Sequence, residues 1–375
     1  MKKIFMFVNV DWFFLSHRLC IAQAAKRNNI IMSVYSEITQ SRSSNFKNFS
    51  MLNSPLTRKS SSYIHLIIEI FSTFFLIKKN SPDLIHAVTI KPIIILGLIS
   101  RITGTPFIGA FSGLGPAFNP KNWRQRFSFK LLIKILKIIF RNNRALAICQ
   151  SKHDRQIIID LNISSSGMIE IIPGSGVDTR TFSPKLRKEN VEEYVLMSSR
   201  ILFDKGIREY CLASNIVSSK INKKLNFFLS GPLDYESPSH ITDSELSNFL
   251  NDSVVEYLGD RKDMPDLLAS ATLFVLPSYY PEGIPKVILE ASSSGIPVIT
   301  TDHPGCRDSI VNNKTGILIP VNDAYSLAEA MLTLISNKEL ACQMGAEGRE
   351  LAVSEFNEAD IINLHYKIYK KLLVE

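Results

Sequence analysis

The chain has 375 residues, a length that suits two domains of ordinary size. Hydrophobic residues make up 45% of it, a content that is normal for a globular protein. The cysteines are odd in number, scattered and never spaced as Cys-x-x-Cys, which argues against a disulfide framework or a structural zinc site. They indicate a reducing cytoplasm and are Cys20, Cys149, Cys211, Cys306 and Cys342.

Neither a secretory signal nor a membrane-spanning helix is predicted. The apolar run after Lys2 and Lys3 is interrupted by Asn9 and Asp11, and no small-residue cleavage site follows it. The best candidate for a spanning helix, residues 63–77, is too short and contains a histidine and a glutamate. We expect that segment to form a buried or interfacial helix.

The net charge of +8 hides a strong asymmetry between the two halves of the chain. Residues 1–190 contain 27 Lys and Arg against 9 Asp and Glu, whereas residues 191–375 contain 16 against 26. The first half, at +18, is therefore expected to meet something anionic, while the second half carries −10. Nucleic acid is one possible partner, but the helix described below favours a membrane surface.

Strands and helices are predicted to alternate along the first half of the chain. Buried strand runs occupy residues 4–8, 30–35, 83–87, 105–110 and 144–149. Helices are expected up to about residue 27 and over 63–79, and a loop over 41–62. Such alternation predicts a parallel α/β sheet that binds ligands at the carboxyl ends of its strands. His86 closes one strand, and a loop with Gly113 and Gly115 follows another.

Residues 121–144 contain eight basic residues and no acidic one. Several of the basic residues form one stripe of a helix beside a wide apolar face, a pattern typical of a helix that lies on anionic lipid. A helix packed on the domain core with its lysines in water would explain the same pattern, and both can hold together. The candidate membrane residues are Trp123, Arg124, Lys130, Lys134, Lys137 and Arg141.

The second half opens with a strand at 194–198, followed by Arg200 and Lys205. Two cations at the end of a first strand suit a diphosphate. Further strands are predicted over 227–232 and from 255, and Arg261 follows the second of these.

Residues 271–301 form a strand–loop–helix–strand unit. Pro285 suits the first turn of a helix that continues to residue 294, and Gly295 is a good left-handed stop. A glycine-bearing loop that enters a helix presents backbone N–H groups and the positive end of the helix dipole, which together bind phosphate. Glu282 on the loop and Glu290 in the helix flank this anion site, as suits a ligand with hydroxyls at both ends and phosphate in the middle. A sugar nucleotide is such a ligand.

The segment EGIPKVILEASSSGIPVI resembles the signature of the retaining glycosyltransferases of family 4, which have the GT-B fold. The resemblance implies that Glu282 approaches the donor sugar, that Glu290 holds the ribose and that the loop Gly283, Ile284 and Pro285 lies at the donor. It also implies that Arg200 and Lys205 bind the donor diphosphate, although Ser199 stands where the family has glycine. Arg261 matches a segment beside the nucleotide base.

The resemblance covers the whole chain and is most specific over residues 195–323. It implies two Rossmann-like domains with parallel sheets that face each other across a cleft, and a last helix that returns to the first domain. The expected domains are an acceptor- and membrane-facing domain over 1–187 and a nucleotide-sugar domain over 188–357, with the returning helix over 358–375. A segment resembling the family's GVD element ends the first domain near residue 184, and a polar linker covers 185–193.

In the first half, the resemblance points to the subgroup that builds bacterial surface polysaccharides on a lipid carrier. It implies that His86 touches the donor sugar or orders the site, beside a structural role that a lone strand-end histidine commonly has. Asp11 and Lys91 are weaker candidates for contacts with the acceptor, together with Gly113 and Gly115.

The expected reaction is sugar transfer, with retention, from a nucleotide-diphosphate sugar, expected to be a UDP-sugar, to a polyprenyl-diphosphate-linked glycan. The chain has no Asp-x-Asp, so no metal or other cofactor is expected, and Arg200, Lys205 and helix amides would stabilise the leaving group. No nucleophile for a double displacement is evident, which favours same-face attack. The enzyme is expected in the cytoplasm, peripherally attached to the inner face of the membrane, without a nucleic-acid partner.

Two alternatives stay open at this stage. One is a sugar-nucleotide epimerase of the same fold, against which the lipid-facing helix argues. The other is a non-catalytic membrane-binding protein, against which the intact set of Glu282, Glu290, Arg200 and Lys205 argues.

Overall fold

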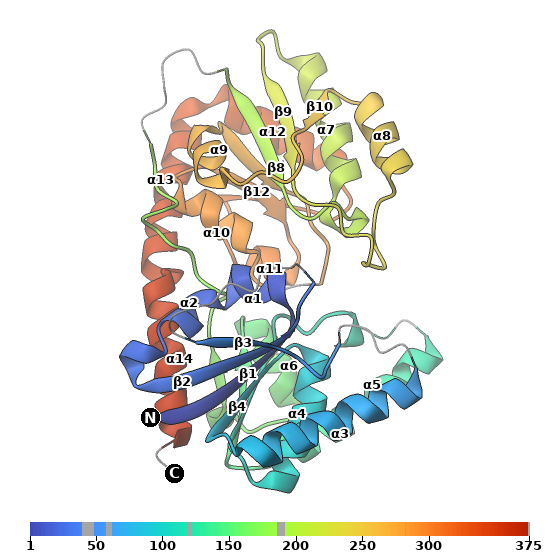
Figure 1. The fold of residues 1–375 in the computed structure, drawn as a ribbon. Coiled ribbons are helices and arrows are strands. Elements are labelled where there is room, and N and C mark those ends of the chain that lie inside the picture. Colours follow the sequence, from blue (N-terminus) through green and yellow to red (C-terminus); the bar gives the residue numbers. More distant parts are fainter. Residues whose placement is uncertain are drawn as a thin grey trace. The chain divides into compact units, whose positions relative to one another are not determined.

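A computed structural model describes residues 1–39, 49–57, 62–118, 120, 122–185, 192–281 and 283–373. The chain divides into two compact units, shown in Figure 1. The first unit comprises Met1–Ser175 with Ala359–Glu375, and the second comprises Gly176–Glu358. The linker predicted over 185–193 thus falls within the second unit, and residues 186–191 of it lie outside the described residues.

The first unit is built on a parallel sheet of seven strands in the order β3-β2-β1-β4-β5-β6-β7 (Figure 1). The strands are β1 (Lys2–Val10), β2 (Ile30–Glu37), β3 (Ser50–Asn53), β4 (Leu84–Val88), β5 (Phe107–Ala110), β6 (Ala145–Cys149) and β7 (Ile169–Ile171). The central strands β4, β5 and β6 are buried along their whole length, as parallel strands covered on both faces must be.

Helices cover both faces of this sheet because alternate strand residues point to opposite sides. Ile4 and Met6 of β1 face a core built with α1 (Asp11–His17), α2 (Leu19–Gln23) and α14 (Glu358–Leu373). Phe5 and Phe7 face the other core, which contains residues of α3 (Tyr63–Asn80), α4 (Ile90–Thr103), α5 (Trp123–Phe140) and α6 (Lys152–Asp160). The last helix therefore belongs to the first unit, as predicted.

The second unit has a parallel sheet of six strands in the order β10-β9-β8-β11-β12-β13. These are β8 (Tyr194–Ser198), β9 (Asn226–Ser230), β10 (Val255–Tyr257), β11 (Leu273–Leu276), β12 (Val298–Thr301) and β13 (Gly316–Ile319). Its helices are α7 (Ile207–Lys220), α8 (Asp243–Asn251), α9 (Met264–Ser270), α10 (Lys286–Ser293), α11 (Pro304–Arg307), α12 (Ala324–Ser336) and α13 (Lys338–Glu355). Helix α7 packs against α12 and α8, and helix α10 packs against α9 and α13. Strands, helices and order agree with the predicted α/β class.

Three sequence-based placements were wrong. β1 runs from Lys2 to Val10 and α1 starts at Asp11, so the strand is longer than the run predicted over residues 4–8. The segment predicted as a loop over 41–62 contains the edge strand β3, which pairs with β2. His86 lies in the middle of β4 and not at its end, because the strand continues to Val88.

Candidate active site

The two cations predicted to bind a diphosphate meet at one aromatic ring in the second unit. Arg200 follows β8, and Lys205 ends the short 3-10 helix η4 (Phe203–Lys205). The guanidinium carbon of Arg200 lies 5.6 Å from the centre of the Tyr280 ring, and Lys205 Nζ lies 5.1 Å from it. Arg200 also donates a hydrogen bond of 2.7 Å to Asp234. The structure therefore brings both predicted cations to the ring of Tyr280.

The loop that carries Tyr280 is fixed to the loop that carries Lys205. The Tyr279 N–H donates to the Asp204 carbonyl at 2.9 Å, and the Ser278 hydroxyl donates to the same carbonyl at 3.3 Å. Gly206 makes this approach possible: it has φ of +78°, and a Cβ there would lie 2.3 Å from the Pro277 carbonyl oxygen. Two loops far apart in the sequence are thus held at the carboxyl ends of β8 and β11.

A second close approach joins the ends of β8, β9 and β10. Gly231 has φ of +140°, and a Cβ there would lie 1.7 Å from the carbonyl oxygen of Ser199. The Gly231 N–H donates to the Gly259 carbonyl at 2.9 Å, and the Tyr257 hydroxyl donates to the Gly231 carbonyl at 2.7 Å. Ser199 replaces the family's glycine without disturbing this arrangement, because its hydroxyl turns to the Arg200 carbonyl at 2.9 Å.

The loop that enters α10 is anchored by an apolar side chain. Ile284 packs in a small core with Val177, Leu289 and Phe356, while Gly283 and Pro285 are also buried. Pro285 is the residue before the first helical position, one place earlier than the first turn predicted for it. Gly295 has φ of +75° just after the helix, as predicted for its stop. Glu282 lies outside the described residues.

Glu290 lies in the second turn of α10 with 16% of its side chain exposed. Burial raises the pKa of its carboxyl group to about 7, although the Lys286 ammonium group at 4.0 Å opposes this shift. A carboxyl group with this pKa takes up or releases a proton near neutral pH. The carboxyl oxygen atoms can hydrogen-bond to ligand hydroxyl groups, and the predicted contact of Glu290 with the ribose stays a prediction.

Arg261, the candidate for the nucleotide base, is exposed and engaged with its neighbour. Its guanidinium donates two hydrogen bonds to the Asp263 carboxylate, one of 2.8 Å from Nε and one of 2.5 Å from Nη2. This local pair orients the side chain beside the start of α9, and its role at a base stays a prediction.

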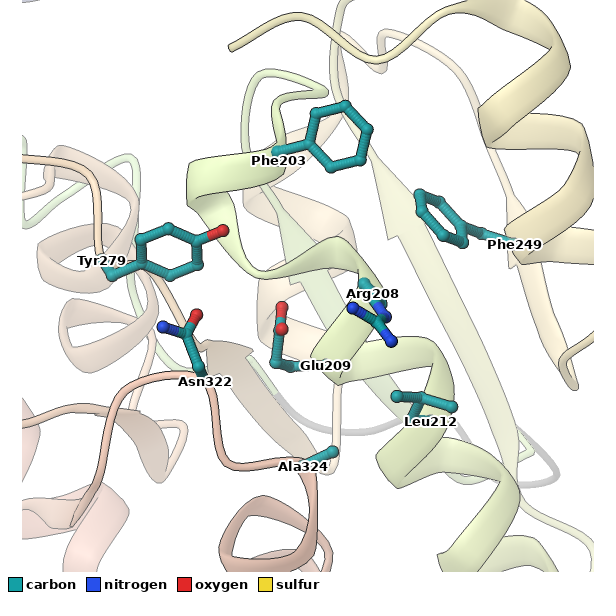
Figure 2. A pocket seen from close by; sticks show the side chains of 8 residues that line it. All are labelled: Phe203, Arg208, Glu209, Leu212, Phe249, Tyr279, Asn322 and Ala324. Atoms are coloured by element: carbon teal, nitrogen blue, oxygen red, sulfur yellow. The ribbon is translucent and has the colours of Figure 1, made fainter.

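A cavity of about 480 Å³ in the second unit lies elsewhere (Figure 2). Its lining contains none of the residues predicted for the donor and consists of Phe203, Arg208, Glu209, Leu212, Phe249, Tyr279, Asn322 and Ala324. Tyr279 faces this cavity, whereas Tyr280 contacts the two cations. We place the candidate site at Arg200, Lys205 and Tyr280, because charge and loop geometry identify a phosphate site better than volume does.

In the first unit, His86 is completely buried. Its Nδ1 shares a hydrogen bond of 2.8 Å with the Tyr369 hydroxyl of α14, and the His365 ring lies 6.0 Å away. Burial, then His365 and Arg18, hold the pKa of His86 well below its usual range, so the ring is neutral. This hydrogen bond ties β4 to the last helix, which fits a structural role for His86, and its expected contact with a donor sugar stays a prediction.

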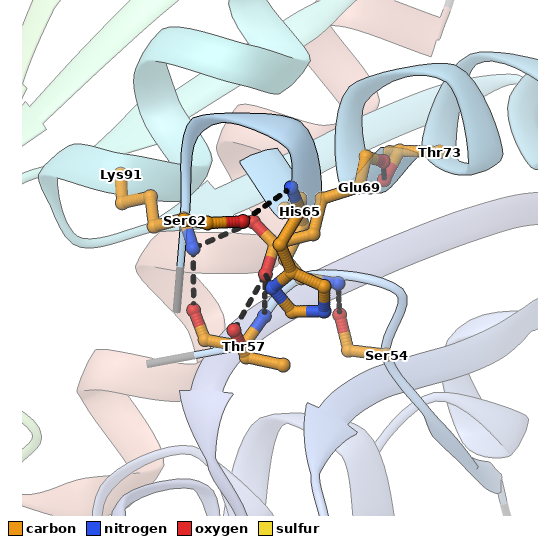
Figure 3. A network of polar contacts seen from close by, with 8 residues as sticks. Ser54, Thr57, Ser62, His65, Glu69, Thr73 and Lys91 are labelled. Carbon is orange, nitrogen blue, oxygen red and sulfur yellow. Dashed lines mark hydrogen bonds and ion pairs between the residues drawn. The ribbon is translucent and has the colours of Figure 1, made fainter. Parts of the chain in front are cut away.

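The predicted acceptor residues Asp11 and Lys91 are also engaged within the first unit. Asp11 accepts hydrogen bonds from the Thr39 N–H at 3.0 Å and from the Thr39 hydroxyl at 2.7 Å. Lys91 forms an ion pair of 2.8 Å with the buried carboxylate of Glu69, as Figure 3 shows. Both residues hold structure together here, and neither is brought to Gly113 or Gly115 by any described contact.

Gly113 and Gly115 lie in the loop after β5 with φ of +86° and +68°, conformations that favour glycine. The predicted membrane helix forms as α5, and Lys121 at the start of that segment lies outside the described residues. Trp123, Arg124, Lys130, Lys134 and Arg141 are exposed, and Lys137 is half-buried. The apolar residues Leu132, Leu136 and Ile139 pack on the core, so α5 is held on the domain with its basic stripe in solvent.

Sequence reasoning missed Tyr280 and Asp234. Tyr280 directly precedes the proline and glutamate of the signature, so its position beside the phosphate loop was a usable signal. Asp234 gave none, because its pairing with Arg200 spans 34 residues. Within the described part of the chain, no three His, Cys, Asp or Glu side chains gather as metal ligands, and the metal-independence of the site stays a prediction.

Two family models match the chain, one on each half. The model described as glycosyl transferases group 1 matches residues 178–351, and the model described as glycosyl transferase 4-like matches residues 3–151. Together they span the sheets of both units.

Named relatives agree with these matches. The chain is 27% identical over 339 residues to the UDP-Gal:alpha-D-GlcNAc-diphosphoundecaprenol alpha-1,3-galactosyltransferase of Escherichia coli, which covers 85% of this chain and 83% of that protein. It is 32% identical over 179 residues to the N,N'-diacetylbacillosaminyl-diphospho-undecaprenol alpha-1,3-N-acetylgalactosaminyltransferase of Campylobacter jejuni, covering 48% of this chain and 45% of that one.

Among solved structures, the sucrose-phosphate synthase of Thermosynechococcus elongatus superposes with a TM-score of 0.79. The superposition covers 100% of both chains at 18% sequence identity, which establishes the fold. The chain therefore belongs to the glycosyltransferases, with the GT-B fold, a glycosyltransferase 4-like first half and a group 1 second half.

Proposed function

We propose that this enzyme transfers a sugar from a UDP-sugar, with retention of configuration, to a glycan linked to a polyprenyl diphosphate. The observation that carries the proposal is the group formed by Arg200, Lys205 and Tyr280 at the carboxyl ends of β8 and β11. The names of both relatives, which describe transfer to sugars on diphospho-undecaprenol, support this class of acceptor. UDP is named for the donor of the first relative.

The described residues divide the donor between them. Arg200 and Lys205 neutralise the diphosphate, and the backbone at the start of α10 adds the positive end of a helix dipole. Glu290, in the second turn of that helix, accepts hydrogen bonds from the ribose hydroxyls. We assign Glu282 to the donor sugar on the basis of the signature alone, because it lies outside the described residues.

Stabilising the leaving diphosphate is the main catalytic contribution of these residues. As the glycosidic bond breaks, negative charge grows on the UDP oxygen atoms, and fixed cations lower the free energy of that transition state. Tyr280 holds both cations in place by contact with its ring. Since the sequence offers no nucleophile for a double displacement, we propose attack on the same face as the leaving group, without a metal ion.

We also propose that the first unit binds the acceptor and attaches the enzyme peripherally to the inner face of the cell membrane. The basic stripe of α5 supports this proposal, since an acceptor on a polyprenyl carrier resides in a bilayer. Within the described part of the chain, no helix is both long and apolar enough to span a membrane.

The test is release of UDP from a panel of UDP-sugars with a polyprenyl-diphosphate-linked glycan as acceptor, in the presence and absence of EDTA. We expect EDTA-resistant release that depends on the acceptor and is lost in Glu282→Ala and Lys205→Ala. Arg208→Ala is the matched control, because it removes a cation from the first turn of α7 that lines the other cavity. Acceptor-independent release would favour the epimerase, and no release from any donor would favour a non-catalytic protein.

A further inference from the structure

The helix α3 turns two polar side chains toward the protein beside the buried Ile77, while most of its large apolar side chains face solvent. The inner side contains Glu69, which is 2% exposed, and Thr73, which is completely buried. Seven large apolar residues point outward, and Tyr63 and Phe75 among them are 89% and 62% exposed. We name these residues the α3 outer face: Tyr63, Ile64, Ile67, Ile68, Ile70, Phe71 and Phe75.

A polar network fixes this orientation (Figure 3). The Glu69 carboxylate pairs with Lys91 of α4 at 2.8 Å and accepts a hydrogen bond of 3.1 Å from the Thr57 N–H. The Lys91 ammonium group also donates to the Thr57 carbonyl at 2.7 Å. Turning α3 so that its apolar side faced the protein would move the Glu69 carboxylate away from the Lys91 ammonium group. This would break a buried ion pair, which is costly. This network therefore keeps the α3 outer face turned toward solvent.

The α3 outer face continues into a strongly basic surface. Helix α4 contacts both α3 and α5, so the three helices lie side by side on one face of the seven-stranded sheet. Trp123, Phe127, Leu131 and Ile138 of α5 are exposed as well. Exposed cations lie at the end of α3, on α4, along α5 and directly after it: Lys78, Lys79, Arg101, Arg124, Arg126, Lys130, Lys134 and Arg141. The three helices contain one acidic residue, Glu69, and it is buried.

This distribution of charge selects the partner. A second copy of the chain would bring two sets of cations together around the apolar residues, and like charges disfavour such an interface. An anionic bilayer offers hydrocarbon for the apolar side chains and phosphates for the cations in the same plane. An exposed apolar patch of this extent on one side of a unit marks an interaction site.

We propose that the α3 outer face inserts into the interface of an anionic bilayer, while the cations of α5 bind the lipid headgroups. This proposal rests on the proposed function, which requires an acceptor in a membrane, but it assigns the apolar anchor to α3. Helix α5 then supplies mainly electrostatic attraction. The two helices should therefore contribute separable parts of membrane affinity, one insensitive to salt and one sensitive to it.

The test is co-sedimentation of the full chain with vesicles of phosphatidylcholine alone, or mixed with phosphatidylglycerol, at low and at high salt. One variant carries Ile68→Asn and Phe71→Asn, and a second carries Lys130→Gln and Lys134→Gln. The matched control carries Val254→Asn and Val353→Asn, two exposed apolar residues of the second unit. All substitutions lie on exposed side chains, so folding is preserved, which circular dichroism checks.

We expect the α3 variant to lose about tenfold or more in affinity for the mixed vesicles at both salt concentrations. The α5 variant should lose about 25-fold at low salt and little at high salt, since each cation near an anionic surface contributes about fivefold. The control should bind as the unmodified chain does. Vesicle binding needs no sugar nucleotide, so it is independent of the UDP-release assay that tests the proposed function.

Two results would overturn the proposal. One is an α3 variant that binds mixed vesicles as tightly as the control. The other is a stable dimer of the unmodified chain, seen by sedimentation velocity, that the α3 variant dissociates without any change in vesicle binding. The second result would assign the α3 outer face to a second copy of the chain.

Discussion

Replacing Glu290 with glutamine should remove a pH-dependent loss of stability from the second unit. The pKa of the Glu290 carboxyl group is about 7 in the folded protein, against the usual 4.5, chiefly because the group is buried. At 1.36 kcal/mol per pKa unit, this gap means that ionising Glu290 destabilises the folded unit by about 3 kcal/mol. Glutamine has nearly the same shape and does not ionise.

The sign of this pH dependence follows from whether the folded or the unfolded state binds the proton of Glu290 more tightly. Because the folded pKa lies above the unfolded one, the favourable contribution of the bound proton is fully present below about pH 4.5. It is lost as the pH rises from there through about 7. Between pH 5 and pH 8, the free energy of unfolding of the unmodified unit should therefore fall by about 2–3 kcal/mol more than that of Glu290→Gln.

Urea unfolding followed by circular dichroism at pH 5 and pH 8 measures this difference. Glu350→Gln is the matched control, since Glu350 is exposed on α13 of the same unit. We expect Glu290→Gln to be more stable than the unmodified protein at pH 8 and similar to it at pH 5, with no such change in the control. Equal pH dependence of the unmodified protein and Glu290→Gln would refute the reasoning and show that the carboxyl group is solvated.

Three further comparisons test the packing and the candidate site. Gly231→Ala should lower the free energy of unfolding, measured with urea, by about 3 kcal/mol or more. Gly259→Ala is its control: the added Cβ would meet open space at a φ of +71°, so the same measurement should show a loss of about 1 kcal/mol. Tyr280→Leu should weaken UDP binding about five- to tenfold in calorimetry, since both cations lose their ring contact; unchanged affinity would contradict its role. Lys91→Met should lower stability by about 3 kcal/mol, and adding Glu69→Leu should restore most of it in thermal unfolding, because the double variant leaves no buried charge unpaired.

Much of the second unit was predictable because its signals are local. A proline before a helix, a glycine after it and an apolar strand run depend on neighbouring residues only, so α10, the stop at Gly295 and the strand Val298–Thr301 were all predicted closely. The pairing of Arg200 and Lys205 was also foreseeable, because both follow the same strand. The place of Tyr280 beside the signature was a usable signal, but its contact with both cations was not foreseeable, since its loop lies 75 or more residues later.

In the first unit, the decisive contacts are distant in sequence. His86 shares its hydrogen bond with a tyrosine 283 positions later, so nothing near it in the sequence identified its partner. Lys91 looked like a residue for a ligand because its partner, Glu69, lies on another helix. Pair contacts of this kind exist only after the chain has folded, and neither residue type nor spacing reveals them.

Local patterns of apolar residues, glycine, proline and charge were enough to predict the fold class, the family and the two cations that we assign to the donor phosphates. Tertiary structure decided which faces of the helices are free. The composition of α3 predicts a helix, but only the pairing of Glu69 with Lys91 determines that its apolar side faces outward. The physical reason is the cost of leaving a buried charge without a partner, which outweighs the usual preference to bury apolar side chains.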